Sequence, residues 1–409
     1  MSKIQEMIER LCPNGVEYKT FGDLCSLVTK QTGFDYSSTI KPSLLRQPTT
    51  DSLPYIQTRH FSGKVFSYDT EFYVPKSTWI QYPKLVLNEP VLLISIVGSL
   101  GNIGLYPGKI VGFLGGAICI ARVKPQFNIS YIYYFLSSPD GQKQIRAVTK
   151  GSGQATITIE DIRKFEIPIP PLPVQEEIVR VLDTFTELQA ELQAELQKRL
   201  QQYNYYRDNL LSFEGRTDVE WKELGEVCYY PRERVAGSML TADTYISTEN
   251  LLTNKKGKTS ALSVPLESCI KYQKQDILIG NIRPYLRKIW LANNDGGTNG
   301  DVVLIRRKED YENVIDSKYL YYVLSSEDFF NYNNSFAKGA KMPRGDKAKI
   351  MQYELPIPSL NEQERIASIL DRFDTLTNDL TAGLPAEIEK RRQQYEYYRD
   401  QLLTFKRAN

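Results

Sequence analysis

The chain contains nearly the same eleven-residue peptide twice. QQYNYYRDNLL begins at Gln201, and QQYEYYRDQLL begins at Gln393, 192 residues later. Upstream, FEIPIPPLPVQEEIVRVLDTF from Phe165 corresponds to YELPIPSLNEQERIASILDRF from Tyr353, and VEYKTFGDLC at position 16 corresponds to VEWKELGEVC at position 219. Self-similarity over such lengths indicates a repeat architecture. The sequence therefore predicts two tandem copies of one unit of roughly 200 residues.

Each copy has a divergent front part that alternates strand and helix signals. V-E-Y-K and V-E-W-K alternate apolar and polar residues, which predicts a half-buried strand in each copy. KLVLNEPVLLISIVGS and QDILIGNIR predict further strands that end in turns marked by glycine. YIYYFLSSPDGQKQI and YLYYVLSSEDFFNYN each predict one helix.

Each rear part predicts long helices. No Gly or Pro occurs between Gln175 and Phe213, a stretch of about 39 residues that would form a rod of roughly 58 Å. Leucines recur every four residues in it, a spacing that drifts around a helix and needs a crossing partner helix; they are Leu188, Leu192, Leu196 and Leu200.

The second rear part contains four additional residues in TAGLPAEIEK. Gly383 and Pro385 predict that one helix ends there and another begins, and Asn361 with Glu364 predicts a capping box at the start of the first. Because a lone amphipathic helix would leave its apolar stripe in water, we expect the two rods to pack antiparallel. The alternative is that each rod is a solvated structural helix.

The predicted fold class is α+β. Two globular α/β heads would be joined by two long antiparallel helical stalks, with a pseudo-two-fold internal repeat that places the heads at opposite ends. The predicted boundaries are residues 1–164 for the first head, 165–215 for the central stalk, 216–352 for the second head and 353–409 for the C-terminal stalk. A spacer of this length exceeds one turn of B-DNA, about 34 Å.

Composition excludes several function classes. The chain has 409 residues, ordinary hydrophobic and charged fractions, and a net charge of +2, so any nucleic-acid surface must come from local patches. A single histidine argues against histidine catalysis and His-rich metal sites. Five cysteines without a C-x-x-C pair fit a reducing compartment. The charged N-terminus and the lack of a long apolar stretch predict a cytoplasmic protein.

Catalytic motifs are also missing. An amino-methyltransferase loop of the N/D-P-P-Y/F type does not occur, and IPIPPLP lacks its polar and aromatic residues. VGSLGNIG is rich in glycine but does not match G-x-G-x-x-G, and no P-loop is present. Paired carboxylates with a nearby lysine, as a metal-dependent nuclease needs, occur only as fragments that strand alternation explains. We expect no catalysis, no metal and no cofactor in this chain.

The order of these parts resembles the specificity subunit of type I restriction-modification enzymes over essentially the whole chain. The residues that carry the resemblance are the IPxPPLxxQEEI-type stalk, the ELQ tetrapeptide repeat, GLPAEI and QQYEYYRDQLLTF. It implies that each head is a target recognition domain for one half of a bipartite DNA sequence and that the ELQA-type repeat adjusts half-site spacing.

The resemblance also implies partners and cofactors. Two methylation subunits would dock on the stalks and carry S-adenosylmethionine, and restriction subunits with ATP and Mg would join them. The repeated peptide would meet the same partner twice. The docking candidates are the four leucines above with Tyr205, Tyr206, Tyr397 and Tyr398.

DNA contacts need cationic and amide side chains on loops. AVTKGSGQATIT and AKGAKMPRGDKAK lie just before the two stalks and provide Lys150, Ser152, Gln154 and Thr156 in the first head and Lys338, Lys341, Arg344 and Lys347 in the second. Further candidates follow YIQT and YIST or lie in NIRPYLRK: Arg59, His60, Glu249, Asn250, Lys255, Lys256, Arg283, Arg287 and Lys288.

The sequence leaves several alternatives open. Basic loops are common on ordinary surfaces, and His60 is equally consistent with a packed ring. A coiled-coil protein scaffold without DNA contact is a rival function, against which the basic loops at matched positions in both heads argue. A stand-alone restriction enzyme or methyltransferase fusion is disfavoured by the missing catalytic motifs.

Overall fold

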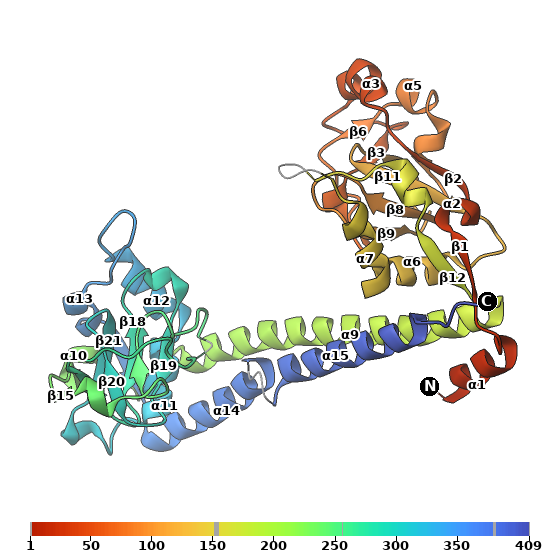
Figure 1. Cartoon of the computed structure of the whole chain (residues 1–409). Helices are drawn as coiled ribbons and strands as arrows, with labels where there is room; N and C mark the ends of the chain where they lie inside the picture. Colours follow the sequence, from red (N-terminus) through yellow and green to blue (C-terminus); the bar gives the residue numbers. More distant parts are fainter. Residues whose placement is uncertain (1, 151–154, 256, 379–381, 409) are drawn as a thin grey trace. The chain divides into compact units, whose positions relative to one another are not determined.

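The computed structural model describes residues 2–150, 155–255, 257–378 and 382–408. The chain divides into two compact units, Met1–Ala190 with Lys390–Asn409 and Glu191–Glu389 (Figure 1). Each unit has a head of sheets and short helices beside long helices. Within the described residues, no helix combines the length and apolar character needed to cross a membrane.

The head of the first unit contains two four-stranded sheets. One has the order β2 (Cys25–Lys30), β11 (Ile118–Val123), β8 (Val91–Ser95) and β9 (Ile103–Tyr106), with every neighbouring pair antiparallel. The other has the order β6 (Tyr73–Val74), β3 (Leu53–Ile56), β10 (Gly112–Leu114) and β7 (Val86–Leu87), in which β3 and β10 are parallel. All five residues of β8 are buried, which explains its continuous apolar run.

The head of the second unit repeats this plan. Its first sheet has the order β14 (Cys228–Tyr229), β21 (Val302–Arg307), β18 (Ile277–Gly280) and β19 (Ile289–Leu291). Its second contains β15 (Arg234–Val235), β17 (Cys269–Tyr272), β20 (Gly296–Thr298) and β16 (Tyr245–Ile246), with β16 and β20 parallel. The heads differ at this sheet's edge, since β6 flanks the parallel strand in one and β15 flanks the antiparallel strand in the other.

A short two-stranded sheet links head to helices in each unit. β1 (Glu17–Thr20) pairs with β12 (Glu166–Ile169), and β13 (Glu220–Glu223) pairs with β22 (Glu354–Ile357). The register is equivalent, since Glu17 faces Ile169 and Glu220 faces Ile357. The strands predicted from V-E-Y-K and V-E-W-K are therefore confirmed.

The prediction of one helix each for YIYYFLSSPDGQKQI and YLYYVLSSEDFFNYN is wrong. The first forms α6 (Ile129–Ser137) and α7 (Pro139–Val148), and the second forms α11 (Ser317–Leu324) and α12 (Glu327–Ser335). Ser138 and Ser326 are extended, and their hydroxyls accept hydrogen bonds from the amides of Gly141 and Phe329. Each serine therefore caps a new helix, and Pro139 further disfavours a helical residue before it.

The long rear helix is confirmed as α9 (Leu172–Leu211), of 40 residues. The second rear part forms α14 (Leu360–Asn378) and α15 (Leu384–Leu403), with Pro385 in the first turn of α15 as predicted. The capping box at Asn361 is wrong, because the hydroxyl of Ser359 accepts from the amide of Glu362 and Asn361 lies inside the helix.

The helices run antiparallel within each unit. In the first, the amide of Val16, before β1, donates to the carbonyl of Lys406, after α15, while further along α9 the ring of Phe185 lies 5.4 Å from that of Tyr398. Because β1 pairs with β12 just before α9, the start of α9 lies near the end of α15. In the second unit Arg216 lies 4.0 Å from Glu362, and the ring of Tyr206 stacks on Phe373 at 5.5 Å.

These contacts explain the repeated peptide within the fold. Its tyrosines pack on Phe185 in the first unit and on the equivalent Phe373 in the second. Both copies of the peptide thus pack against the same kind of helix inside this chain.

The contacts that fix each head to its helix are also duplicated. The side-chain nitrogen of Gln175 donates to the carbonyl of Pro170, and its side-chain oxygen accepts from the backbone amide of Asn128. The side chain of Gln363 makes the same two bonds to Pro358 and Asp316. In addition, the hydroxyls of Tyr134 and Tyr322 donate to Asp183 and Asp371, at 2.5 and 2.6 Å. The glutamine of the Q-E-E and Q-E-R motifs therefore serves to hold the head.

Candidate nucleic-acid interface

Both heads carry a hairpin at the same place, just before the stalk. In the first head Lys150 pairs with Thr156, and in the second Lys338 pairs with Arg344, both antiparallel. The far arm of each hairpin also pairs with the segment that follows the central strand, at Val97 after β8 and at Ile282 after β18. The two basic loops predicted from the sequence therefore occupy equivalent positions on the two heads.

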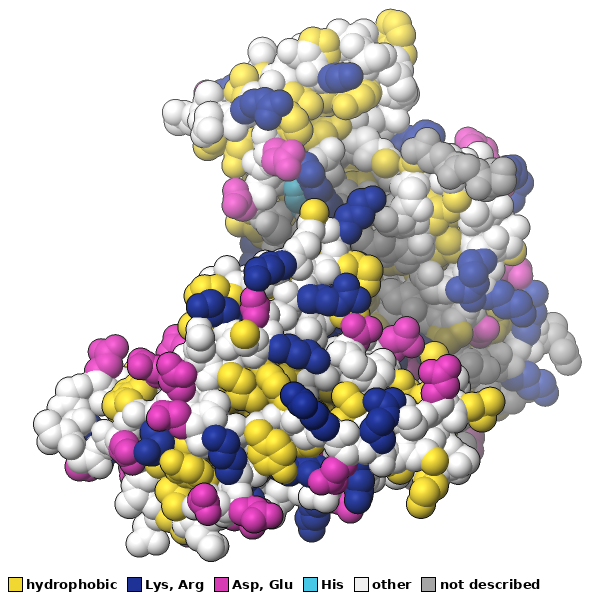
Figure 2. Space-filling view, turned by 90° about the vertical axis from the view of Figure 1, so that its left-hand side faces the viewer, with side chains coloured by type: hydrophobic (Ala, Val, Ile, Leu, Met, Phe, Trp, Pro, Cys, Tyr) yellow, Lys and Arg dark blue, Asp and Glu magenta, His cyan; other side chains and the backbone are white. Residues whose placement is uncertain are grey.

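The second hairpin presents several cations. Lys341 is exposed, and the Lys338 side chain is 82% exposed although it lies 2.8 Å from Asp346. Lys347, the first residue of the following helix α13 (Lys347–Met351), is also exposed and donates to the carbonyl of Gly300. Arg344 lies 3.3 Å from Asp301. Lys338 and main-chain hydrogen bonds lower the pKa of Asp346, so its carboxylate stays charged. Figure 2, which looks onto the second unit, shows Lys and Arg side chains spread over it among apolar, Asp and Glu side chains.

The first hairpin carries fewer cations. Lys150 is exposed and lies 3.5 Å from Asp161, and the exposed Thr156 is in the far arm. A hydrogen bond from the Thr158 hydroxyl, and to a lesser degree Lys150, lowers the pKa of Asp161. Ser152, Gln154 and, in the second head, Lys256 lie outside the described residues.

The turn that follows the central strand is the second shared element. It spans residues 95–102 in the first head and 280–288 in the second, between paired isoleucines of neighbouring strands. Gly98 and Gly101 have φ of +77° and +83°, and Arg283 and Arg287 have φ of +53° and +52° at the equivalent positions. A left-handed backbone suits glycine but costs roughly 1–2 kcal/mol at any other residue. The second head therefore keeps two arginines at an energetic cost.

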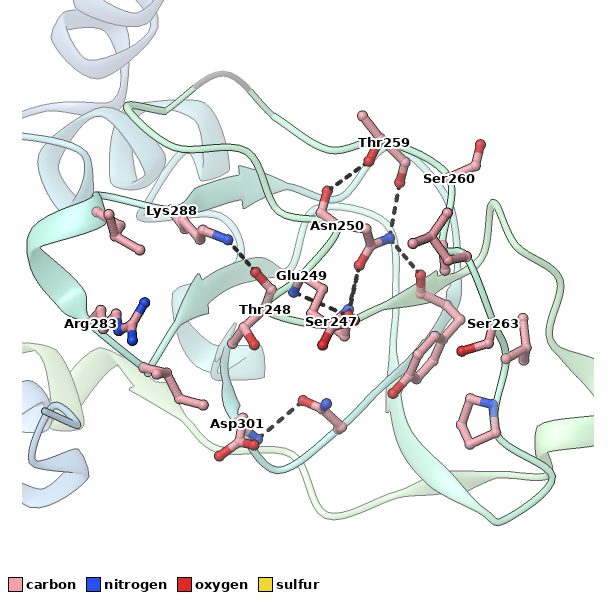
Figure 3. Close-up of a pocket in the computed structure, with 18 of the residues that line it drawn as sticks. Ser247, Thr248, Glu249, Asn250, Thr259, Ser260, Ser263, Arg283, Lys288 and Asp301 are labelled. Carbon is pink, nitrogen blue, oxygen red and sulfur yellow. Dashed lines mark hydrogen bonds between the residues drawn. The ribbon is translucent and has the colours of Figure 1, made fainter. Parts of the chain in front are cut away.

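A cavity of about 740 Å³ lies beside this turn in the second head (Figure 3). Arg283 and Lys288 line one side, Asp301 lies below, and Glu249 and Ser247 come from the loop after β16. Apart from the candidates named from the sequence, its lining includes Thr248, Ser260, Leu262, Asn299, Asp301 and Met342. No sequence signal identified these residues, because their segments converge only through the tertiary fold.

Two lining residues have structural roles. Asn250 is buried, its side-chain amide donates to the carbonyls of Tyr245 and Thr259, and its oxygen accepts from the amide of Ser247 at 2.6 Å. These bonds hold the loop and leave it little capacity to contact DNA. The ammonium of Lys288 donates to the carbonyl of Thr248, and burial lowers the pKa of Lys288.

Lys255 and Arg287 belong to an ionic cluster around Glu327. Both pair with Glu327, at 3.5 and 2.6 Å, and the Lys255 side chain is only 15% exposed. Burial, reinforced by the charge of Arg207, lowers the pKa of Lys255 to about 8. Arg207, from the repeated peptide, is itself buried and lies 2.7 Å from Asp208. Lys255 and Arg287 therefore hold their loop and turn to α12 within the head.

In the first head, His60 is buried and its Nδ1 accepts a hydrogen bond from the amide of Gln57. Burial lowers the pKa of this ring, which favours its neutral form. The packed ring, the alternative left open by the sequence, describes it better than a DNA contact. Arg59 is half exposed and lies 2.9 Å from Glu71.

The stalk candidates are only partly accessible. All four leucines of the tetrapeptide repeat are half-buried. Tyr205 and Tyr397, at equivalent positions of the repeated peptide, are 67% and 61% exposed, whereas their neighbours Tyr206 and Tyr398 pack on phenylalanine rings. Among the residues that the structure describes, no group of three or more His, Cys, Asp or Glu side chains is placed to hold a metal ion.

Comparison with known proteins matches this duplicated architecture. The family model of the type I restriction modification DNA specificity domain matches twice, over residues 13–202 and 217–390. The type I restriction enzyme EcoR124I/EcoR124II specificity subunit of Escherichia coli is 33% identical over 306 residues, covering 68% of this chain and 71% of its own. A putative type I restriction enzyme specificity subunit of Haemophilus influenzae is 33% identical over 305 residues, 70% of this chain and 74% of that protein.

The fold agrees with solved structures. The crystal structure of a type I restriction-modification system S subunit from M. genitalium matches with a TM-score of 0.58, at 15% identity, over 95% of this chain and 96% of that one. A second chain, from a study of complex assembly and conformational transition of the type I restriction-modification system, matches with a TM-score of 0.55 at 16% identity over 96% and 98%. With two family domains covering most of its length, the chain belongs to the type I restriction modification DNA specificity family.

Proposed function

We propose that this chain is the non-catalytic subunit that selects the DNA sequence for a type I restriction-modification complex. One half-site of a bipartite target would be bound by each head. The observation that carries this proposal is the equivalent hairpin and turn on both heads, built on the same backbone pairing with different side chains. Two sites of the same construction and different chemistry suit a target with two different halves.

The hairpins would contribute the phosphate contacts, which need cations and tolerate mobility. Lys341 and Lys347 are the strongest candidates, because both are exposed and no carboxylate lies within 4.0 Å of either among the described residues. The cavity beside the turn in the second head would supply base contacts. It combines an arginine with carboxylate, amide and hydroxyl groups, the side chains that distinguish base edges in the major groove.

Two methylation subunits would dock on the helices, one per unit, with restriction subunits joining through them. This part of the proposal is supported by the matched exposure of Tyr205 and Tyr397, since large exposed aromatic side chains are typical anchors of protein interfaces. S-adenosylmethionine would then be bound by the methylation partner, and ATP and Mg by the restriction partner. This chain would contribute sequence selection and assembly.

The proposal is tested by mapping methylated bases across the genome of cells that express the chain with its cognate methylation subunit. A parallel culture expresses the methylation subunit alone. We expect a split motif, two short specific parts around a fixed unread gap, which is methylated only when the chain is present. A stable complex with no chain-dependent methylation would refute DNA selection and favour a protein-only scaffold.

A further inference from the structure

The two arginines in the turn of the second head differ in what their side chains contact. Arg287 pairs with Glu327 at 2.6 Å, so its side chain stabilises the head. Arg283 is exposed and has no carboxylate within 4.0 Å in the part of the chain that the structure describes. Its left-handed backbone is therefore not compensated by an ion pair.

The turn itself does not need an arginine. The first head forms the equivalent turn with Gly98 at this position, and the amide there makes the same hydrogen bond to the hairpin. The amide of Gly98 donates to the carbonyl of Ala155, and the amide of Arg283 donates to that of Pro343, the matching residue of the second hairpin. Glycine would satisfy the backbone at lower cost, so the side chain of Arg283 accounts for its presence.

The surroundings of Arg283 fix its position. Its amide is bonded to the hairpin at 2.7 Å, and its carbonyl accepts from the amide of Leu286 at 2.8 Å. Its side chain points toward the cavity, across from Glu249 and Asp301 (Figure 3). Asp301 is engaged by Arg344 at 3.3 Å. A guanidinium on such a rigid base suits directional recognition, whereas a phosphate contact is provided equally well by an exposed lysine such as Lys341.

We propose that Arg283 is a specificity-determining residue of the second head that recognises a guanine through its O6 and N7 atoms. The planar fork of arginine matches these two acceptors in the major groove. The inference rests on the proposed function. It adds that the second half-site contains a G·C pair whose recognition depends on this one side chain.

The decisive variant is Arg283→Gly, because the first head shows that glycine is compatible with this turn. The variant retains the backbone and removes only the side chain, so we expect it to fold and to assemble with the methylation subunit as the wild type does. Lys341→Gly is the matched control, a cation on the same hairpin face that is removed from an exposed position. Motifs are mapped in cells, and binding of the purified complex is measured on duplexes that carry each base at each position.

We expect Arg283→Gly to leave the first half-site and the gap unchanged and to relax one G·C position of the second half-site. Discrimination there should fall roughly 5- to 150-fold, the range for one bidentate base contact. Lys341→Gly should weaken binding to all sequences alike. An unchanged motif in Arg283→Gly, or a uniform loss like that of Lys341→Gly, would overturn the inference. Absence of a split motif in the wild type would instead refute the proposed function.

Discussion

The two units agree where head meets helix and differ where each head ends in its hairpin and turn. At the attachment, Gln175 and Gln363 make equivalent hydrogen bonds, as do Tyr134 and Tyr322. At the hairpin and turn the backbone pairing is retained, but the side chains of the turn change from glycine to arginine. The difference indicates that the duplicated part holds the heads, and under the proposed function the divergent part would specify the two half-sites.

The largest effect is expected from the helix segment between the two units. Deleting Glu191 to Ala194 removes one tetrapeptide and shortens α9 by about 6 Å, less than two base-pair steps of about 3.4 Å. We expect methylation to move to targets with the same half-sites and a shorter gap, as measured by motif mapping. The exposed substitution Gln193→Lys, which keeps the helix length, is the control. Altered half-sites at unchanged spacing would contradict the spacer assignment.

The next effect compares the two buried glutamines. Gln363→Met keeps the volume but leaves the carbonyls of Pro358 and Val314 and the amide of Asp316 without their partners, whereas Gln175→Met affects two such groups. We expect losses of about 3 and about 2 kcal/mol in unfolding free energy, respectively. Hydrogen exchange read by mass spectrometry would localise each loss to its own unit, with the exposed Gln201→Met as control. Equal effects of all three variants would show that the anchors are not structural.

A smaller effect tests whether the units dock equivalent partners. Tyr205→Ala and Tyr397→Ala each remove an exposed ring that lies 5.6 or 5.4 Å from the ring of the next tyrosine, which retains its phenylalanine partner. We expect each to weaken binding of one methylation subunit by about tenfold, as for a typical interface anchor, measured by calorimetric titration. Tyr229→Ala, also exposed but outside the repeated peptide, should have no effect. A loss from only one of the two variants would mean that the symmetry does not extend to docking.

The smallest effect is expected from the ionic cluster of Lys255, Arg287 and Glu327 in the second head. The pKa of Lys255 is about 8 in the folded chain and ordinarily 10.5, so between these values the unfolded chain binds a proton that the folded chain lacks. Unfolding free energy from this group therefore rises with pH, by about 1 kcal/mol between about pH 7.5 and 9. Denaturant unfolding of wild type and Lys255→Met should show this rise only in the wild type. If the unfolding free energies of both proteins changed in parallel with pH, burial of Lys255 would not be the cause of the rise.

The sequence predicted the repeat, the long helix and the matched positions of the two basic loops, because these depend on local patterns and on the comparison of the chain with itself. It failed at the break before α7 and α12, where a serine hydroxyl competes with helix continuation. Among the site residues, it identified Arg283 by charge alone. It could not separate this residue from Asn250 or Lys255, since burial and hydrogen bonding depend on segments distant in sequence.

The two units differ in how the end of a long helix is joined to the first strand of the head. In the second, peptide bonds connect α9 through residues 212–219 to β13, whereas in the first the amide of Val16 donates to the carbonyl of Lys406 and the amide of Ala408 donates to that of Val16. The hydroxyl of Tyr18 adds a bond to the carbonyl of Phe405, and the guanidinium of Arg407 covers the Tyr18 ring at 4.5 Å. Hydrogen bonds thus serve in one unit as peptide bonds do in the other. A gene divided at the codon for Gly215 would yield two half-length proteins. The second unit would then have to hold α9 and β13 together without a peptide bond, and the hydrogen bonds of the first unit are a natural example of such a non-covalent join.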